Sequence, residues 1–165
     1  MDFEKNNRAE KEPIIKTKTI TAQDLKDYIY KGESLPQDER FLSTKEGGVF
    51  KYFALEDLID FREKDDNFYS VVEMDDKVVG LSGLKKDPDR EKNLWMMFVS
   101  IDPKYQGKGY SRKLVEEVFE FAKNNGCSLR PSMYSEEGEK RLKRIIQEFA
   151  EKTSVQLVDN YGRNL

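Results

Sequence analysis

A continuous hydrophobic run followed by a helical stripe marks the middle of the chain. The run Leu94–Val99 is bounded by polar residues, and such a run predicts a strand that is buried on both faces. We expect that strand to span Leu94–Ile101 and a helix to follow over Ser111–Lys123, because apolar residues repeat there at helical spacing. The apolar stripe of this helix consists of Leu114, Val115, Val118, Phe119 and Ala122.

Shorter segments on either side carry the same two periodicities. Helix patterns follow Thr21, which is placed as an N-cap, occupy Ala54–Lys64, and follow Ser135. The last of these helices has a predicted buried stripe of Leu142, Ile145, Ile146, Phe149 and Ala150. Strand patterns occur over Ile14–Ile20, Phe68–Met74, Lys77–Leu84, Cys127–Tyr134 and Val155–Val158.

Turn and loop signals separate these elements. Phe68–Met74 and Lys77–Leu84 are predicted to form a hairpin that turns at Asp75 and Asp76. Gly80 and Gly83 in its second strand predict a bulge or a close contact, and Pro131 predicts an edge or splayed position for the strand that contains it. The stretches 33–52 and 85–92 are expected to be loops, and residues 160–165 to trail off.

Composition narrows the class of protein. A chain of 165 residues predicts one domain, here over residues 13–165, after a charged and mobile tail over residues 1–12. The net charge of -3 argues against non-specific binding to nucleic acid. The chain has no histidine, which excludes Ser-His-Asp triads, Cys-His dyads and His-ligated metals, and we expect no metal cofactor.

The single cysteine and the hydropathy pattern bear on the compartment. Cys127 excludes an internal disulfide and is expected to be a small buried strand residue rather than a nucleophile. This cysteine usage fits a reducing, cytoplasmic compartment. No apolar run approaches the length of a membrane span, and the N-terminus has no apolar signal-peptide core, so no membrane partner is expected.

A glycine turn between the central strand and its helix predicts a phosphate site. Gly107 and Gly109 lie within the turn, where the absence of a Cβ lets the backbone approach a ligand closely. The helix that follows presents unpaired N–H groups and a partial positive charge. The spacing fits neither a P-loop nor the dinucleotide fingerprint Gly-x-Gly-x-x-Gly, because Arg112 stands at the last position of the fingerprint.

The pattern that fits is Gln/Arg-x-x-Gly-x-Gly/Ala, which runs from Gln106 to Ser111. It resembles the acyl-CoA-binding motif of the GNAT N-acetyltransferase superfamily, as does the lead-in Ile101–Tyr105, although Ser111 replaces the usual Gly or Ala. The order of elements from Phe68 to Ala150 also resembles that family. The resemblance implies an α/β (α+β) fold. Its mixed, mostly antiparallel central sheet has helices on both faces, and its fourth and fifth strands splay apart.

The resemblance also implies a set of residues that contact acetyl-CoA. The backbone of Val99, Ser100 and Ile101 would pair with the pantetheine arm, and the turn would donate N–H groups to the pyrophosphate. Lys108 and Arg112 would add positive charge. The alternative is a tight strand-to-helix turn in which the glycines are needed only for the backbone conformation. The implied cofactor-binding residues are Val99, Ser100, Ile101, Gln106, Gly107, Lys108, Gly109, Tyr110, Ser111 and Arg112.

Two residues are candidates for proton transfer during acetylation of a primary amine. Relatives often carry a carboxylate on the middle strand and a tyrosine in the last helix, and this chain has neither at those positions. Glu73 on the preceding hairpin is the nearest substitute for a base, unless it is an outward-facing charge or the amine loses its proton through water. Tyr134 is the candidate acid that protonates the departing thiolate, with core packing as its alternative role.

Two other groups of residues are expected to have structural roles, and two other functions are alternatives to the main prediction. Trp95, Met96 and Met97 are expected to be core residues rather than a substrate pocket, and the basic run 140–144 to be the solvated face of a helix. We expect an N-acetyltransferase that acts on a small molecule, peptide or protein, either as a monomer or as a homodimer. The alternatives are a non-catalytic acyl-CoA-binding module of the same fold and an interaction protein with an accidental glycine turn.

Overall fold

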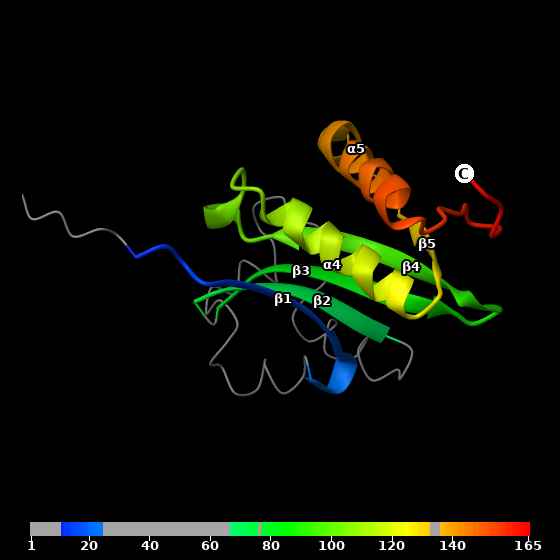
Figure 1. The fold of residues 1–165 in the computed structure, drawn as a ribbon, viewed down its shortest axis with the longest axis horizontal. Helices are drawn as coiled ribbons and strands as arrows, with labels where there is room; N and C mark the ends of the chain where they lie inside the picture. The colour runs from blue at the N-terminus through cyan, green and yellow to red at the C-terminus, as the bar shows by residue number, and fades with distance from the viewer. Residues whose placement is uncertain (1–10, 25–66, 76, 133–135) are drawn as a thin grey trace, which may run out of the picture.

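A mixed sheet forms the centre of the molecule (Figure 1). The structure is a computed structural model and describes residues 11–24, 67–75, 77–132 and 136–165. Its five-stranded sheet has the order β1-β2-β3-β4-β5, in which β1 to β4 pair antiparallel and β4 and β5 pair parallel. This confirms the predicted fold class. The strands are β1 (Ile15–Thr21), β2 (Asn67–Met74), β3 (Lys77–Asp87), β4 (Arg90–Ile101) and β5 (Ser128–Pro131).

Two helices pack together on this sheet. Helix α4 spans Tyr110–Asn124 and lies against the sheet, and α5 spans Glu136–Thr153 and packs beside α4 (Figure 1). One hydrophobic cluster joins β3, β4 and β5 to both helices, and the predicted stripe of α4 is buried within the two clusters that the helix contacts. The fully buried residues of α4 are Leu114, Val115, Val118, Phe119 and Ala122.

A bulge divides β4 into two parts. Gly83 pairs with Phe98, and the next residue, Leu84, pairs with Met96, so Met97 is an extra residue in β4. The bulge keeps hydrophobic side chains on the helical side along the whole strand. Met96 packs there before the bulge, and Val99 packs there after it. The predicted bulge or close contact at Gly83 is therefore confirmed.

The prediction that the central strand is buried on both faces is wrong. Leu94 and Met96 are 0% and 2% exposed and face α4, whereas Trp95, Met97 and Phe98 are only half-buried. A continuous apolar run carries no alternation from which the two faces of a strand can be told apart.

Two expected loops are ordered parts of the fold. β3 continues to Asp87 and β4 begins at Arg90, so the predicted loop 85–92 is a hairpin, held by an ion pair of 3.6 Å between these two residues. Residues 160–165 do not trail off, because Val158 and Asn164 form an antiparallel bridge. The predicted last strand, Val155–Val158, is reduced to one parallel bridge between Leu129 and Leu157.

Local signals at two element ends are confirmed. The hydroxyl of Thr21 accepts a hydrogen bond from the Asp24 N–H at 3.1 Å, and the Asp24 carboxylate accepts from the Thr21 N–H at 3.1 Å. This reciprocal cap begins a helix at residue 22. Asp75 forms the hairpin turn with a φ of 48°.

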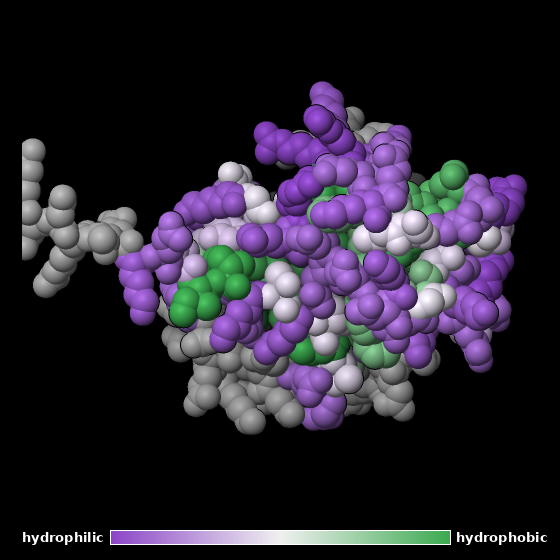
Figure 2. All heavy atoms as spheres, in the orientation of Figure 1, coloured by the Kyte–Doolittle hydropathy of each residue, from purple (hydrophilic) through white to green (hydrophobic). Residues whose placement is uncertain are grey.

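Several predictions fall on residues outside those the structure describes. They are the mobile tail over residues 1–10, the body of the helix after Thr21, the loop over 33–52, the helix Ala54–Lys64, and Tyr134. Within the described ranges, no helix is both long and apolar enough to cross a membrane. The face shown in Figure 2 is mostly hydrophilic, as expected of a chain in which 37% of residues are charged.

The bulge generates a test of packing at Gly83. A Cβ at this position would lie 2.5 Å from Cε1 and 2.7 Å from Cζ of Phe98, which an alanine cannot do without moving the ring. We expect Gly83→Ala to lower the free energy of unfolding by about 1–3 kcal/mol, measured by denaturant titration.

Gly80→Ala is the matched control on the same strand, because the one close atom at its Cβ is the flexible Cδ1 of Ile101 at 2.7 Å, while Leu114 and Ser100 lie at ordinary contact distances of 3.6 Å. We expect it to lose less stability. Phe98→Leu should reduce the loss of stability caused by Gly83→Ala. If Gly83→Ala lowers the free energy of unfolding equally with and without the Phe98 ring, the proposed clash is contradicted.

Candidate functional site

A gap opens between β4 and β5 part of the way along the sheet. The two strands pair from Asn93 and Ser128 as far as Met96 and Pro131, and the last link is the Ser132 N–H donating to the Met96 carbonyl at 3.1 Å. Beyond this point β4 continues beside β3 alone. The predicted splay of the fourth and fifth strands is therefore present, and Pro131 stands where it begins.

Beyond the point where β5 leaves, the backbone N–H and C=O groups of β4 point alternately towards β3 and away from it. The Asp102 N–H donates to the Val79 carbonyl at 2.8 Å, which makes these two residues a hydrogen-bonded pair across β3 and β4. In an antiparallel ladder such pairs alternate with pairs whose polar groups point outward. Val99 and Ile101 therefore direct their N–H and C=O groups away from β3, towards the side that β5 has left. Ser100 is buried, and its backbone pairs with Leu81.

The turn after β4 has the backbone shape that its glycines predict. A short 3₁₀-helix, η1 (Pro103–Tyr105), is capped by the Asp102 carboxylate, which accepts from the Lys104 N–H at 3.0 Å. Gly107 and Gly109 then adopt φ values of 77° and 83°, in the region that favours glycine. The Gln106 side chain folds back and donates to the Ile101 carbonyl at 3.1 Å.

Helix α4 begins at this turn without a side-chain cap. Gly109 is the N-cap, and its carbonyl accepts the first helical hydrogen bond from the Lys113 N–H at 3.3 Å. The N–H groups of Tyr110, Ser111 and Arg112 precede that bond and have no acceptor within the helix. No acidic residue lies in the first turn. The helix start therefore offers amide donors and positive potential to an anion.

The turn also carries a concentration of positive charge. Lys108 is exposed, with its Nζ 5.7 Å from the centre of the Tyr105 ring. No acidic residue occurs between Asp102 and Glu116, although the chain as a whole is acidic. The basic residues in that interval are Lys104, Lys108, Arg112 and Lys113.

Arg112 has a protein partner that the sequence did not reveal. Its guanidinium forms a two-pronged ion pair with the Glu148 carboxylate of α5, with one N–O distance of 2.9 Å, and lies 5.0 Å from the centre of the Phe149 ring. Hydrogen bonding by Arg112 lowers the pKa of Glu148, and the same bond raises the pKa of Arg112. In this structure Arg112 links the two helices.

Tyr110 contributes its side chain to the core. It is 8% exposed, packs with Val72, Val79 and Leu114, and its hydroxyl donates to Sδ of Met74 at 3.4 Å. Only its backbone N–H faces the open end of α4.

Glu73 is not an outward-facing charge. It is buried on β2, where its carboxylate pairs with Nζ of Lys18 at 3.0 Å. β3 lies between β2 and β4, so Glu73 does not border the gap. Tyr134 lies outside the described residues. Cys127 is buried as expected, one residue before β5, and burial raises its pKa.

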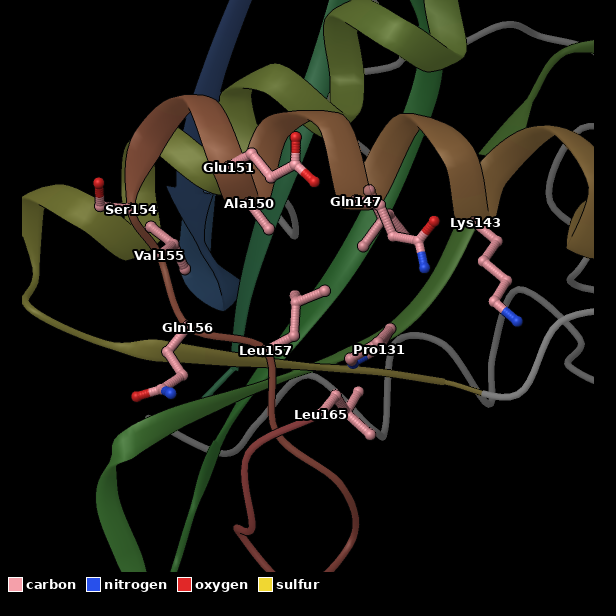
Figure 3. Close-up of a pocket in the computed structure, with 11 residues that line it drawn as sticks. Pro131, Lys143, Gln147, Ala150, Glu151, Ser154, Val155, Gln156, Leu157 and Leu165 are labelled. Atoms are coloured by element: carbon pink, nitrogen blue, oxygen red, sulfur yellow. The ribbon is translucent and has the colours of Figure 1, made fainter.

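A separate hollow lies on the other side of α5 (Figure 3). It has a volume of about 880 Å³ and is bounded by α5, Pro131 and the segment 154–165. Lys143 and Gln147 point into it from α5, towards Leu157 and Leu165. None of the residues from 99 to 112 borders it, so it is distinct from the site at the glycine turn.

Sequence reasoning missed the side-chain partners at the site. Glu148 is 36 residues from Arg112, and Lys18 is on a different strand from Glu73, so no local spacing signals either pair. The bond from Gln106 to Ile101 is different, because both residues lie in the motif and its lead-in, and only the direction of the amide was unforeseen.

Comparison with known proteins identifies the family. A sequence model described as "Acetyltransferase (GNAT) family" matches residues 33–137, which is more than half of the chain. The chain therefore belongs to the GNAT acetyltransferase family. It is also similar to human N-acetyltransferase 8B, with 38% identity over 61 residues. That match covers 35% of this chain and only 27% of the length of the human protein.

Solved structures share the fold at low sequence identity. A GNAT-family acetyltransferase from Streptococcus pneumoniae superimposes with a TM-score of 0.57 at 14% identity, covering 82% of this chain and 83% of that one. The ribosomal-protein-alanine N-acetyltransferase of Brucella melitensis gives 0.56 at 11%, covering 79% and 87%. The aminoglycoside N-acetyltransferase AAC(6')-Iy in complex with CoA gives 0.51 at 14%, covering 89% and 91%.

The link between Arg112 and Glu148 generates a test in acid. A carboxylate with a lowered pKa stabilises the fold above its usual value of 4.5, and this contribution is lost as the pH falls through the lowered pKa. We expect Glu148→Gln to lower the melting temperature at pH 7 by no more than roughly 2 °C, because both groups are exposed. The difference from the parent protein should vanish below the lowered pKa.

Glu151→Gln is the control, since it removes the same charge from α5 and the structure describes no ion pair for Glu151. We expect it to leave the melting temperature nearly unchanged at pH 7. An equal effect of the two substitutions would show that net charge, and not the pair, sets the difference.

Proposed function

We propose that the chain transfers an acetyl group from acetyl-CoA directly to a primary amine. The observation that carries this proposal is the parting of β4 and β5 just upstream of the glycine turn. It leaves outward-pointing backbone groups of Val99 and Ile101 in line with the amides at the start of α4. The peptide-like arm of an acyl-CoA could pair with the backbone groups of Val99 and Ile101, and its pyrophosphate could bind the amides at the start of α4. Family membership supports the same activity.

Most of the cofactor-binding residues predicted from the sequence fit these two roles, but Ser100 does not, because its backbone pairs with Leu81 of β3. Val99 and Ile101 would pair with the pantetheine amides, although the Ile101 carbonyl already accepts from Gln106 and would need to be shared. The amides from Gly107 to Arg112 would bind the pyrophosphate, with Lys108 as the free-standing cation of the turn. Arg112 would act chiefly by holding α5 against α4, since its donors are engaged by Glu148.

The chemistry requires three proton movements. An ammonium group first loses a proton, and the neutral amine nitrogen then attacks the thioester carbonyl carbon. The nitrogen loses a second proton as the C–S bond breaks and the amide forms, and the departing CoA thiolate gains one. The donor is a co-substrate, so no group is left bound to the protein.

Glu73 and Tyr134 remain the proposed proton carriers. Because β3 separates Glu73 from the gap, Glu73 would act through water. Tyr134 follows β5 by a few residues and precedes the body of α5, which supports a position near the departing sulfur. Its phenol, with a pKa near 10, can protonate a thiolate and be recharged by solvent.

The rival proposal is an acyl-CoA-binding module without activity. Both readings predict that CoA stabilises the fold, by about 2.7 kcal/mol at a ligand concentration 100 times the dissociation constant. An interaction protein with an accidental glycine turn predicts no shift. Release of CoA from acetyl-CoA in the presence of amines then separates an enzyme from a binding module.

The glycine turn generates the test of binding. We expect Gly109→Val to abolish measurable CoA binding, assayed by calorimetry, because a branched side chain is strained at a φ of 83° and would crowd the approach of phosphate. The fold should be largely kept, since no atom lies within 4 Å of the added Cβ.

Gly126→Val is the matched control for that strain. Gly126 also has a positive φ, 63°, and open space at its Cβ, but it lies at the far end of α4. We expect a similar loss of stability with normal CoA affinity. Unchanged CoA affinity in Gly109→Val would remove the basis of the proposed site.

The acid generates the test of catalysis. Tyr134→Phe keeps the ring and removes the proton, so we expect kcat to fall by roughly 10²–10⁴-fold with little change in the KM for acetyl-CoA, measured by steady-state kinetics. A purely structural tyrosine would instead lose about 1 kcal/mol of stability and keep nearly normal turnover.

Tyr161→Phe is the control, since Tyr161 is 70% exposed. Glu73→Gln tests whether Glu73 accepts the proton that the amine loses. Its effect on kcat should shrink at high pH, where the amine is already neutral. If kcat of Tyr134→Phe stays within a few-fold of the parent value, Tyr134 is not the acid.

A further inference from the structure

A row of three side chains crosses the sheet on the face away from α4. Trp95 of β4 pairs in register with Lys85 of β3 on one side and with Arg130 of β5 on the other. Their sequence neighbours Leu84, Leu94 and Leu129 are fully buried in the cluster under α4 and α5. Since side chains alternate along a strand, Lys85, Trp95 and Arg130 point to the opposite face.

The ring of Trp95 holds the Arg130 guanidinium in place. The central carbon of the guanidinium lies 4.6 Å from the centre of the indole ring. The indole N–H donates to the Ser132 hydroxyl at 2.8 Å, which fixes the plane of the ring. A guanidinium stacked on a fixed aromatic ring keeps its edge donors aimed outward in one plane.

This cation has no anionic partner within the described part of the chain. Arg130 is only partly exposed, and its Nε is buried without a hydrogen-bond acceptor. The structure describes no ion pair for Arg130 or for Lys85. Elsewhere the partly exposed cation Lys18 pairs with the carboxylate of Glu73. Scarcity of acids does not explain this, because the chain has 32 of them.

The row lies beside the gap and far from the phosphate site. Trp95 and Arg130 form the last pair but one before β4 and β5 part. The glycine turn begins after Ile101, six residues further along, which corresponds to about 20 Å of extended strand. An anion held by Arg130 is therefore not the pyrophosphate of the donor. Such an anion would instead belong to a molecule that contacts the face of the sheet opposite α4.

We propose that Arg130, with Lys85 on the far side of Trp95, binds a carboxylate of the amine acceptor. The proposal rests on the acetyl transfer proposed above and narrows its acceptor to amines that also carry a carboxylate, such as amino acids. A guanidinium is suited to this role because its parallel N–H donors match the two oxygens of a carboxylate. Lys85 contributes a second positive charge to the same face.

The test compares amino acids of increasing chain length with their own carboxamides as acceptors. The parent protein should have a lower KM for the carboxylate member of the best pair. Arg130→Gln should raise that KM roughly ten- to a hundredfold, the effect of losing a hydrogen bond to a charged group, while kcat and the KM for the carboxamide stay within about twofold. Arg130→Lys should restore part of the loss, since it keeps the charge without the fork.

Arg141→Gln is the control for net charge, because Arg141 is exposed on α5 and the structure describes no contact for it with the row. O-phosphoethanolamine beside β-alanine separates a carboxylate site from a general anion site. A better KM for the phosphate compound would overturn the assignment to carboxylates. Melting curves of both Arg130 variants show whether an effect reflects loss of the fold.

A binding measurement keeps this inference separate from the activity itself. Calorimetry in the presence of CoA should show that the N-acetylated amino acid binds more tightly than its carboxamide, and that Arg130→Gln removes the difference. If amines are acetylated but carboxylates have no advantage in either assay, the carboxylate site is refuted and acetyl transfer stands. If no amine is acetylated while CoA binds, the proposed activity fails, and equal binding of the two products then refutes the site as well.

Discussion

The loss of one neighbour by β4 shapes the rest of the site. Backbone polar groups inside a protein need partners, and β4 keeps β3 as a partner from Leu94 to Ile101, apart from the bulge at Met97, but keeps β5 only as far as Met96. Pro131 has no N–H to donate, and Ser132 makes the last link. Further along, the side chain of Gln106 in the turn donates a hydrogen bond to the outward-pointing carbonyl of Ile101. Within the described residues, the gap is thus a feature of the backbone that lies beside the packed core.

The bulge at Met97 determines which side chains of β4 face the helices. With it, Met96 and Val99 both face the helices, and the core continues without interruption to the start of α4. In an unbulged strand of the same sequence, Phe98 would face the helices and Val99 would point to the opposite face. The opposite face carries the fully buried apolar residues Tyr69, Val71 and Leu81, together with the ion pair of Lys18 and Glu73 and the cationic row that includes Arg130.

The sequence was sufficient where a local rule determines the structure. The stripe of α4, the cap at Thr21 and the edge or splayed position at Pro131 each follow from a few neighbouring residues. It was insufficient where distant residues meet or where the pattern has no period. The uniform run of β4 hid both its bulge and its half-exposed face, and the partner of Arg112 lies on another helix. The return of the C-terminal segment depends on Asp159, which accepts from the Tyr161 and Arg163 N–H groups, and no hydrophobic pattern signals that turn.

The charge distribution explains how an acidic protein can favour an anionic donor. The net charge of -3 is spread over a surface of mixed sign, whereas the interval from Pro103 to Val115 contains basic residues and no acidic ones. A local positive field at a helix start raises the rate at which anions arrive, even when the total charge repels them. Pairing with Glu148 removes Arg112 from that field in part, so in the proposed function backbone amides and Lys108 would bind the phosphate. Amides do not titrate, and a site built mainly on them keeps its donors at every pH at which the fold survives.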